Sequence, residues 1–452
     1  MSKLDKKTIT EFLDSDYRDY STYTLENRAV PSVIDGFKPV QRKVIHVARK
    51  VWKTGSEKPM KVFQLTGKVS SDAFYHHGDA SLNDAITAMA QRFKNNLPLL
   101  DEVGQFGTLR SPDAAAPRYI GTRLSENFKV AYKDFDLLTP KFEEGYQIEP
   151  RYFLPIIPTI LVNGGSGIAV GYRSDILNRS PRQVTAACLA VLREQALPAL
   201  KPQLNNFAGT YEQEPDSVRK WLITGCFEKI NSTMIRVSEL PPSMTYQKWE
   251  AVLEELVEAK KIKSYDDNTK TSLDYTLRLS REDVEKYMKN PALFIKDCKL
   301  RENYTEFFTT LDEHGKLKIF ECAEDIVRYF VAFRLAYYAK RKAACLACLE
   351  DELTVLSNRA QFIKAILDGE LIINKRSRAD REAQMSVIGL ARKEESYDYL
   401  HRMSIDSLGE ENYKRILQEV KNKKADVKRT KASVPREEYI KDLEELLGKL
   451  TH

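Results

Sequence analysis

One stretch of the chain carries more information about the fold than any other. Residues 26–53 have the sequence ENRAVPSVIDGFKPVQRKVIHVARKVWK. Pro39 can be the first residue of a helix, because the backbone nitrogen at that position has no helical partner in any case. Four valines then follow at helical spacing: Val40, Val44, Val47 and Val51. This pattern predicts a helix with one face in a hydrophobic core.

The same stretch is strongly basic. From Arg28 to Lys53 it holds seven basic residues and one acid, Asp35, and this excess equals the net charge of +6 of the whole chain. The basic residues are Arg28, Lys38, Arg42, Lys43, Arg49, Lys50 and Lys53. A second face of the expected helix would carry a basic stripe made of Arg42, His46, Arg49 and Lys53. We expect nucleic acid as the partner of this stripe; the alternative is an ordinary solvated face.

Composition narrows the class of protein. The chain has 452 residues, of which 42% are hydrophobic and 30% are charged, as in ordinary globular proteins of roughly two to four domains. No apolar run approaches the roughly 18 residues of a membrane helix, and the opening MSKLDKKTITEFL lacks the apolar segment of a signal peptide. The six cysteines are scattered, so no disulfide framework is expected. We expect a cytoplasmic protein without a membrane partner.

Two further regions differ in their predicted secondary structure. Residues 181–322 predict an α+β region, with strands at 234–240 and 272–280, a helix at 246–260 and a hairpin at 307–320. From residue 323 a helical pattern without proline runs until Gly369 can stop it, which favours a coiled coil. A second helix from Tyr413 to about Ala432 could pair with it antiparallel. The charge run KNKKADVKRTK on that helix is interpreted as a solvated face.

Few residues suggest catalysis by themselves. No P-loop lysine motif is present, so ATP hydrolysis by this chain is not expected. NGGSG at 163–167 fits a tight turn better than a dinucleotide-binding loop. Tyr119 follows Arg118 in a segment rich in small residues, which would let a polymer backbone approach closely. As one of 22 tyrosines, it could equally be a packed aromatic.

Several motifs together resemble the cleavage region of type IIA DNA topoisomerases. They keep the order and approximate spacing of that family across residues 20–180: 26–31 with 35–42, Tyr75-His76-His77-Gly78, Gly104-Gln105-Phe106-Gly107-Thr108, Pro117-Arg118-Tyr119-Ile120, and Leu161-Val162-Asn163-Gly164 with Gly167-Ile168. Segments 334–342, 362–369 and 397–405 are similar to the long gate helices of eukaryotic topoisomerase II. The chain also begins and ends as in the split enzymes of T-even bacteriophages, in which cleavage and ATP hydrolysis belong to separate subunits.

The resemblance implies an α+β fold with several parts. We expect an N-terminal arm (1–20), a winged-helix DNA-cleavage domain (21–150) and a tower domain (151–322). A coiled-coil arm (323–452) would carry a small helical dimer gate at 370–412.

The resemblance also implies the chemistry. Tyr119 would be the nucleophile that forms a 5′-phosphotyrosyl link, with Arg118 stabilising charge on phosphorus. His77 and Arg28 would complete the catalytic set. The implied DNA-binding residues are Lys38, Arg42, Tyr75, His76 and Ile168, with Ile168 wedging between base pairs.

Cofactors and partners follow from the same resemblance. Mg²⁺ would be held mainly by the TOPRIM domain of a large partner subunit, which would also use ATP, and no metal ligand is expected in this chain. The other expected partners are double-stranded DNA and a second copy of the chain, through the C-terminal gate. If Tyr119 were only a packed aromatic, the alternative would be a non-catalytic architectural DNA-binding protein with a helical dimerisation arm.

Overall fold

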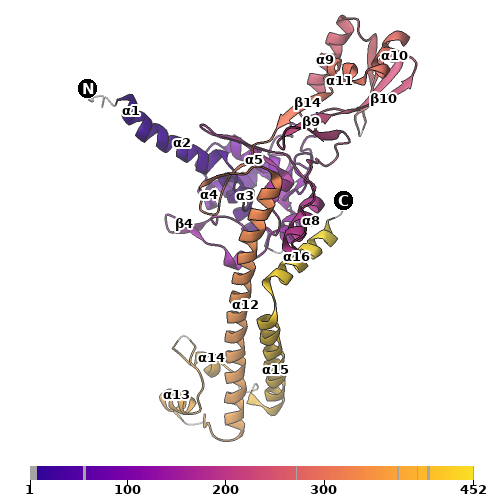
Figure 1. The fold of residues 1–452 in the computed structure, drawn as a ribbon. Coiled ribbons are helices and arrows are strands. Elements are labelled where there is room, and N and C mark those ends of the chain that lie inside the picture. Colours follow the sequence, from indigo (N-terminus) through magenta and orange to yellow (C-terminus); the bar gives the residue numbers. More distant parts are fainter. Residues whose placement is uncertain are drawn as a thin grey trace. The chain divides into compact units, whose positions relative to one another are not determined.

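The computed structural model describes residues 8–53, 58–270, 272–373, 376–393, 395–404 and 408–450. The chain divides into two units. The first unit consists of Met1–Arg334 and Asp442–His452, and the second consists of Leu335–Lys441. The residues outside the described ranges are 1–7 of the arm, 54–57 of the winged-helix region, 271 of the tower, 374–375, 394 and 405–407 of the gate, and 451–452 at the end of the coiled-coil arm. The mixed α+β architecture expected from the sequence is confirmed (Figure 1).

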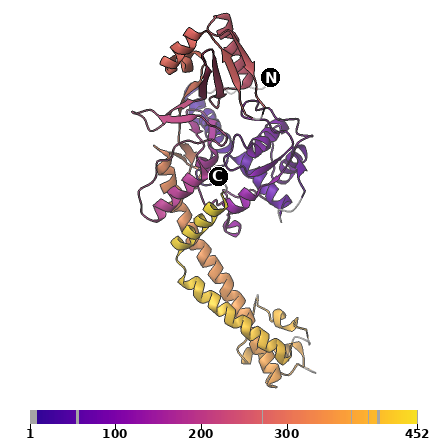
Figure 2. The same ribbon diagram turned by 90° about the vertical axis from the view of Figure 1, so that its right-hand side faces the viewer.

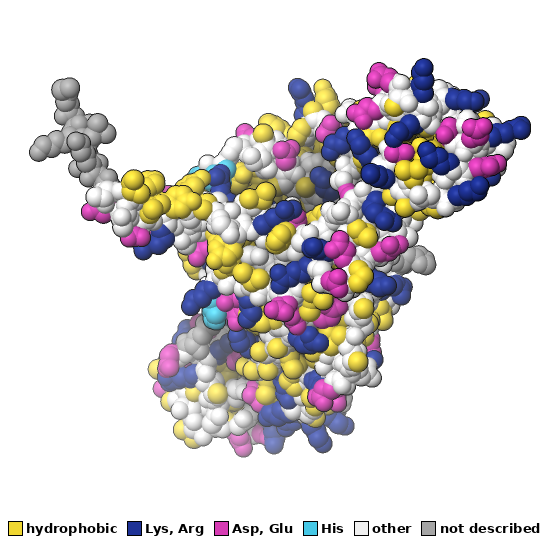
Figure 3. Space-filling view, turned by 45° about the horizontal axis from the view of Figure 1, so that its top comes forward, with side chains coloured by type: hydrophobic (Ala, Val, Ile, Leu, Met, Phe, Trp, Pro, Cys, Tyr) yellow, Lys and Arg dark blue, Asp and Glu magenta, His cyan; other side chains and the backbone are white. Residues whose placement is uncertain are grey.

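The first unit opens with a helical segment that continues to Ala29. It consists of α1 (Ile9–Phe12), η1 (Leu13–Tyr17), α2 (Arg18–Thr24) and η2 (Leu25–Ala29). Thr8 begins it with a capping box, since its side chain accepts from the Glu11 backbone N–H while Glu11 accepts from the backbone N–H of Thr8. Hydrophobic side chains remain exposed along this segment (Figure 3).

Three helices and a small sheet form the winged-helix region. Its elements are α3 (Pro39–Val51), β1 (Met60–Lys61), α4 (Val62–Asp72), α5 (Asp79–Ala90), β2 (Leu100–Val103) and β3 (Gly121–Leu124). The antiparallel sheet has the order β1-β3-β2. Leu65 of α4 and Leu82 and Ile86 of α5 are fully buried, so these helices face the core. The register pairs Lys61 with Gly121, so the residues just before β3 lie beside β1.

Short elements complete the central part of this unit: α6 (Glu126–Ala131), η3 (Phe135–Leu137), β4 (Lys141–Glu143), β5 (Tyr146–Ile148), α7 (Thr159–Asn163), β6 (Gly165–Ile168), β7 (Arg173–Ile176) and α8 (Pro181–Leu192). The NGGSG segment spans the end of α7 and most of β6, so it is not the tight turn expected from the sequence; the turn of the β6–β7 hairpin follows Ile168. Gly36 has a φ of +71° and lies so close to the Ile160 backbone that a Cβ would clash with it. Both facts explain why glycine occupies this position in the 26–53 stretch.

The tower is the expected α+β region. It contains β8 (Thr210–Gln213), β9 (Lys220–Thr224), β10 (Cys226–Asn231), β11 (Met234–Glu239), α9 (Tyr246–Glu258), β12 (Ser264–Asp267), β13 (Tyr275–Arg278), α10 (Arg281–Lys289), α11 (Pro291–Asp297), β14 (Arg301–Thr305), β15 (Thr309–Leu311) and β16 (Leu317–Ile319). Trp249 and Leu253 of α9 pack on the sheet β10-β11-β13-β12 in one hydrophobic core. The strands, helix and hairpin predicted for this region are confirmed.

A long helical hairpin dominates the second unit (Figure 2). α12 (Ala323–Leu367) enters it from the first unit, and α15 (Glu410–Ala432) returns antiparallel: Ile363 packs against Ile416, whereas Glu352 pairs with Lys423. The cap between them holds α13 (Arg378–Val387) and α14 (Asp398–His401) around buried Met385. The predicted coiled-coil pair is confirmed, while α16 (Pro435–Lys449) was not foreseen.

Candidate active site and DNA-binding surface

Tyr119 lies in an exposed turn that is held at its base by β1 and α4. The Tyr119 N–H donates to the Ala116 carbonyl at 2.9 Å, and the N–H of Phe63 donates to the Pro117 carbonyl at 3.3 Å. Ile120 is buried directly after the turn, whereas the Tyr119 side chain is 67% exposed. The backbone is therefore fixed while the phenol faces solvent, as a group that must reach a large substrate requires.

Two cations flank this tyrosine. The Arg118 guanidinium lies 5.4 Å from the Tyr119 ring centroid, which is a cation–π distance. Lys61 Nζ donates to the Tyr119 backbone carbonyl at 2.6 Å. The sequence analysis missed Lys61, because the strand pairing that places it opposite Gly121 joins segments about 60 positions apart. Its position before a capped helix was the only available signal.

A second cluster joins three of the expected site residues. Arg28 is at the end of the N-terminal helical segment, and its Nη2 is 3.4 Å from Nδ1 of His77. The Tyr75 ring meets the His77 ring edge-on, with centroids 5.4 Å apart. Burial raises the pKa of Tyr75, and Arg28 opposes that change. Arg28, Tyr75 and His77 therefore form one exposed polar group at the start of α5.

The loop that carries this cluster is braced by the β4–β5 hairpin. Phe74 has a φ of +51°, which is unusual for a bulky residue. Its ring lies 5.9 Å from that of Tyr146 on β5, and His76 Nε2 is 3.8 Å from a Glu143 carboxylate oxygen on β4. A strained backbone held by aromatic packing is a feature of functional loops.

Lys38 and Ile168 come together through a close approach of backbones. A Cβ at Gly167 would overlap the Ala29 carbonyl oxygen, so only glycine lets β6 run along η2. The same position would lie 3.3 Å from Lys38 Nζ. Ile168, the next residue, is 81% exposed at the end of its strand. Burial lowers the pKa of Lys38.

Arg42 does not join these groups. Its side chain is buried, and its Nε and Nη2 donate to the two carboxylate oxygens of Asp35 at 2.8 and 3.0 Å. Burial opposes the charge of Arg42, but the neighbouring Asp35 carboxylate raises the pKa overall. Because a guanidinium committed to a buried carboxylate cannot reach a phosphate, we correct the expectation that Arg42 binds DNA.

The expected basic stripe on α3 is wrong for the same reason. His46 is also buried, and Arg49 lies 3.6 Å over the Phe135 ring. α3 packs against α4, α5, β3 and η2 at once, so most of its circumference is interior. Lys50 remains exposed on it.

The site residues thus form separate groups within this chain. Among the described residues, no hydrogen bond or ion pair links the Tyr119 side chain to Arg28, Lys38 or His77. No three His, Cys, Asp or Glu side chains gather as metal ligands in the described ranges, and no helix found there is long and apolar enough to cross a membrane.

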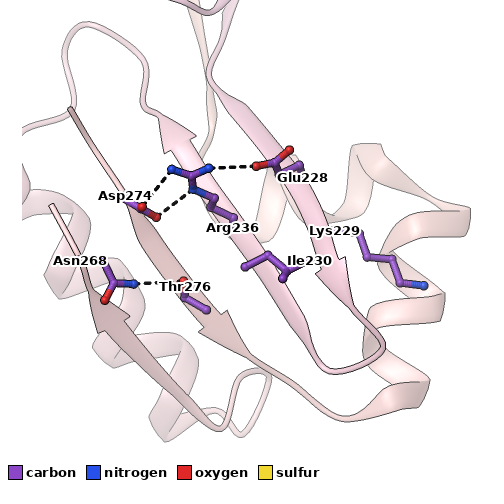
Figure 4. Close-up of a pocket in the computed structure, with 7 residues that line it drawn as sticks. All are labelled: Glu228, Lys229, Ile230, Arg236, Asn268, Asp274 and Thr276. Atoms are coloured by element: carbon purple, nitrogen blue, oxygen red, sulfur yellow. Dashed lines mark hydrogen bonds and ion pairs between the residues drawn. The ribbon is translucent and has the colours of Figure 1, made fainter.

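A surface hollow lies elsewhere, on the tower sheet (Figure 4). It has a volume of about 510 Å³, and Arg236 at its centre is bound to Asp274 and Glu228. With Lys229, which also lines the hollow, the two cations balance the two carboxylates, and no expected site residue lines it.

The chain matches a family model along most of its length. The family is that of the A subunit of DNA gyrase/topoisomerase IV, and the match covers residues 28–446. The chain belongs to this family. The exposed tyrosine turn, the Arg28–His77 group and the exposed isoleucine on β6 therefore lie in a chain of the type II topoisomerases.

Individual relatives agree with this assignment. The chain is 32% identical to the DNA topoisomerase medium subunit of Enterobacteria phage T4 over 452 residues, covering 98% of this chain and 100% of that one. It is 36% identical to DNA topoisomerase 2 of Arabidopsis thaliana, covering 91% of this chain but only 29% of the plant protein. Human DNA topoisomerase 2-alpha is 34% identical, and the chain covers 25% of it.

A solved structure shows the same fold. The crystal structure of the Plasmodium falciparum topoisomerase II DNA-binding, cleavage and re-ligation domain superposes with a TM-score of 0.84 at 29% identity, over 97% of this chain and 64% of that one. This family membership favours the topoisomerase interpretation over the non-catalytic architectural alternative.

Proposed function

We propose that this chain is the DNA cleavage and religation subunit of an ATP-dependent type II topoisomerase, which passes one duplex through a transient break in another. The observation that carries the proposal is the exposed Tyr119 phenol on a fixed backbone, next to the Arg118 guanidinium, in a chain of this family.

The reaction exchanges one phosphate ester for another. The Tyr119 oxygen attacks a backbone phosphorus, the bond from phosphorus to the 3′ oxygen breaks, and that oxygen leaves as a 3′-hydroxyl after gaining a proton. A 5′-phosphotyrosyl link remains, so reversal religates the strand without an external energy source. A phenol in water has a pKa of about 10 and is therefore mostly protonated at neutral pH, so the attack needs a group that removes the proton.

The other residues take supporting roles in this proposal. Arg118 stabilises negative charge on the five-coordinate phosphorus. Arg28 and His77 bind the phosphate backbone or assist proton transfer as one hydrogen-bonded pair. Lys38 holds the backbone, Tyr75 and His76 line the approach, and exposed Ile168 wedges between base pairs.

The metal and the nucleotide are assigned to another subunit. The described residues contain no cluster of three His, Cys, Asp or Glu side chains, and Mg²⁺ is usually held by one or two carboxylates together with substrate phosphates. We propose that an ATPase/TOPRIM large subunit supplies Mg²⁺ and uses ATP, that two copies of this chain meet at the gate formed around α13 and α14, and that the assembly works in the cytoplasm.

The test is Tyr119→Phe. The variant keeps the ring but loses the oxygen, so the assembled enzyme should bind DNA normally and form no covalent adduct. The measurement is denaturation of reaction mixtures containing the large subunit, Mg²⁺ and end-labelled DNA, followed by detection of protein on 5′ ends. Tyr75→Phe is the control, since it also removes one phenol oxygen, from the separate Arg28–His77 group, and should still give adducts. Adducts from Tyr119→Phe would show that another residue is the nucleophile.

A further inference from the structure

The coiled-coil arm carries a second basic surface with a different character from α3. On α15 the residues that pack on α12 include Ile416 and Val420, and Val427 on the same face is also buried. One residue further on, at the same helical spacing, come Lys414, Leu417, Lys421, Lys424, Lys428 and Lys431. All six side chains are exposed. We call the five lysines of this row the lysine stripe.

Four of the five lysines in the stripe have no negatively charged partner among the described residues. Lys431 pairs with Glu350 at 2.8 Å. Lys414, Lys421, Lys424 and Lys428 make no ion pair within the part of the chain that the structure describes. Like charges three or four positions apart destabilise a helix, so binding of an external anion would relieve this repulsion.

The opposite flank of the same helix is the internal comparison. It carries Arg415, Glu419, Asn422, Asp426 and Arg429. There the charges are mixed and pair locally: Arg429 with Asp426 at 2.9 Å, and Arg415 with Glu419 at 3.9 Å. An ordinary solvated face has this mixed composition. The lysine stripe does not, so solubility alone does not account for it.

We propose that the lysine stripe binds the phosphate backbone of double-stranded DNA, as a surface separate from the Tyr119 site. The inference rests on the proposed function, because passing one duplex through another requires surfaces for two duplexes.

The dimensions and chemistry fit this partner. At about 1.5 Å per residue the stripe is roughly 26 Å long, which is less than one turn of duplex at about 34–36 Å. Lysines act as point charges that tolerate variable phosphate geometry, which suits contact with DNA of any sequence.

The first test maps the contact on the unmodified protein. The full chain is treated with an acetylating reagent, with and without a mixed-sequence duplex about four helical turns long, and lysine modification is read by mass spectrometry. We expect Lys421, Lys424 and Lys428 to react at least about threefold more slowly with DNA, while exposed Lys364 on α12 does not change. Equal modification with and without DNA would overturn the proposal. Protection by the large subunit but not by DNA would also overturn it, and would identify an acidic protein surface as the partner.

The second test compares two charge-matched variants in the assembled enzyme. Lys421→Ala with Lys428→Ala removes two charges from the stripe, and Arg415→Ala with Arg429→Ala removes two from the opposite flank. The measurement is retention of a labelled second duplex by enzyme already loaded on an immobilised one, over a range of salt concentrations. A plot of log affinity against log salt has a negative slope of about 0.9 per phosphate contact. The loss of two contacts should make this slope shallower by about 1.8 in the stripe variant, and the slope should stay unchanged in the flank variant. Equal slopes in the two variants would overturn the inference.

The two proposals fail separately. Covalent adducts scored on the same samples report on Tyr119. If wild-type enzyme retains a second duplex through the stripe but forms no adduct, the proposed function is wrong and the stripe still binds DNA. If adducts form and the stripe variant retains the second duplex like wild type, only the stripe proposal is wrong.

Discussion

The helices α3 and α15 are both rich in lysine and arginine, yet the fold treats them in opposite ways. In α3, Arg42 is buried on Asp35 and Lys43 Nζ lies 3.0 Å from a Glu149 carboxylate oxygen. In α15, Lys421, Lys424 and Lys428 are exposed and make no ion pair among the described residues. The difference comes from packing: α3 meets four neighbouring elements, whereas α15 packs mainly along one face on α12. A basic helix is a candidate binding surface only if the fold leaves it a solvent face.

The largest effect that we predict follows from removing Arg42, the buried cation of α3. Arg42→Ala leaves the Asp35 carboxylate buried without its partner, so the free energy of unfolding should fall by about 3–5 kcal/mol. Urea unfolding of the full chain measures it. Lys50→Ala on the exposed side of α3 is the control and should change stability by less than about 0.5 kcal/mol. An Arg42→Ala chain as stable as wild type but weak in DNA binding would reverse our correction of Arg42.

A second prediction concerns the close approach that positions Ile168. Gly167→Ala would force a Cβ onto the Ala29 carbonyl oxygen, so the strand or the end of η2 must move. We expect a loss of about 1–3 kcal/mol in urea unfolding, as in other overpacked sites. Gly67→Ala is the control, because a Cβ there meets nothing within 4 Å and alanine favours the helix. Equal stability of the two variants would show that β6 has room to shift.

A third prediction is that Lys61 positions Tyr119 through the hydrogen bond to its backbone carbonyl. Lys61→Ala removes the 2.6 Å hydrogen bond to the Tyr119 carbonyl, so the turn loses a fixed anchor. We expect adduct formation at saturating DNA to slow by about tenfold, with little change in the DNA concentration required. Lys61→Arg should recover most of the rate, which a purely steric role would not explain. A change in DNA affinity alone would mean that Lys61 contacts DNA rather than positioning Tyr119.

A further prediction is a pH dependence of stability that comes from His46 on α3. Burial, followed by the charges of Lys50 and Arg49, lowers the pKa of His46 from 6.5 to about 4. Between these values the unfolded chain binds a proton that the folded chain refuses, so the free energy of unfolding falls as pH drops from about 6.5 to 4. Above about pH 6.5 His46 makes no such contribution.

His46→Leu should flatten this part of the stability profile. Urea unfolding of wild type and variant at several pH values between about 7 and 4.5 measures the difference between them. His314→Leu, at an exposed position on the β15–β16 turn, serves as the control and should keep the wild-type slope. Parallel profiles for His46→Leu and wild type would place the His46 ring in contact with solvent.

Sequence reasoning performed best where structure is local. The 323–369 helix and the hairpin at 307–320 follow from periodicity and turn residues, and both are present. It performed worst on the surroundings of single side chains. Arg42 and His46 have the spacing of a surface stripe, but spacing does not reveal how many elements pack around a helix. Lys61 was missed because β-sheet register joins distant segments.

The sequence by itself therefore determined the long arm helix and the 307–320 hairpin, which depend on local periodicity and turn residues, and its resemblance to the family indicated the candidate nucleophile. The tertiary structure alone decided which charges reach solvent. It buried Arg42 against Asp35, placed Arg28 beside His77, brought Lys61 to Tyr119 and left the lysine stripe of α15 largely without counter-charges among the described residues. The physical reason is that burial and ion pairing arise from contacts between segments far apart in the chain, and those contacts exist only once the chain has folded.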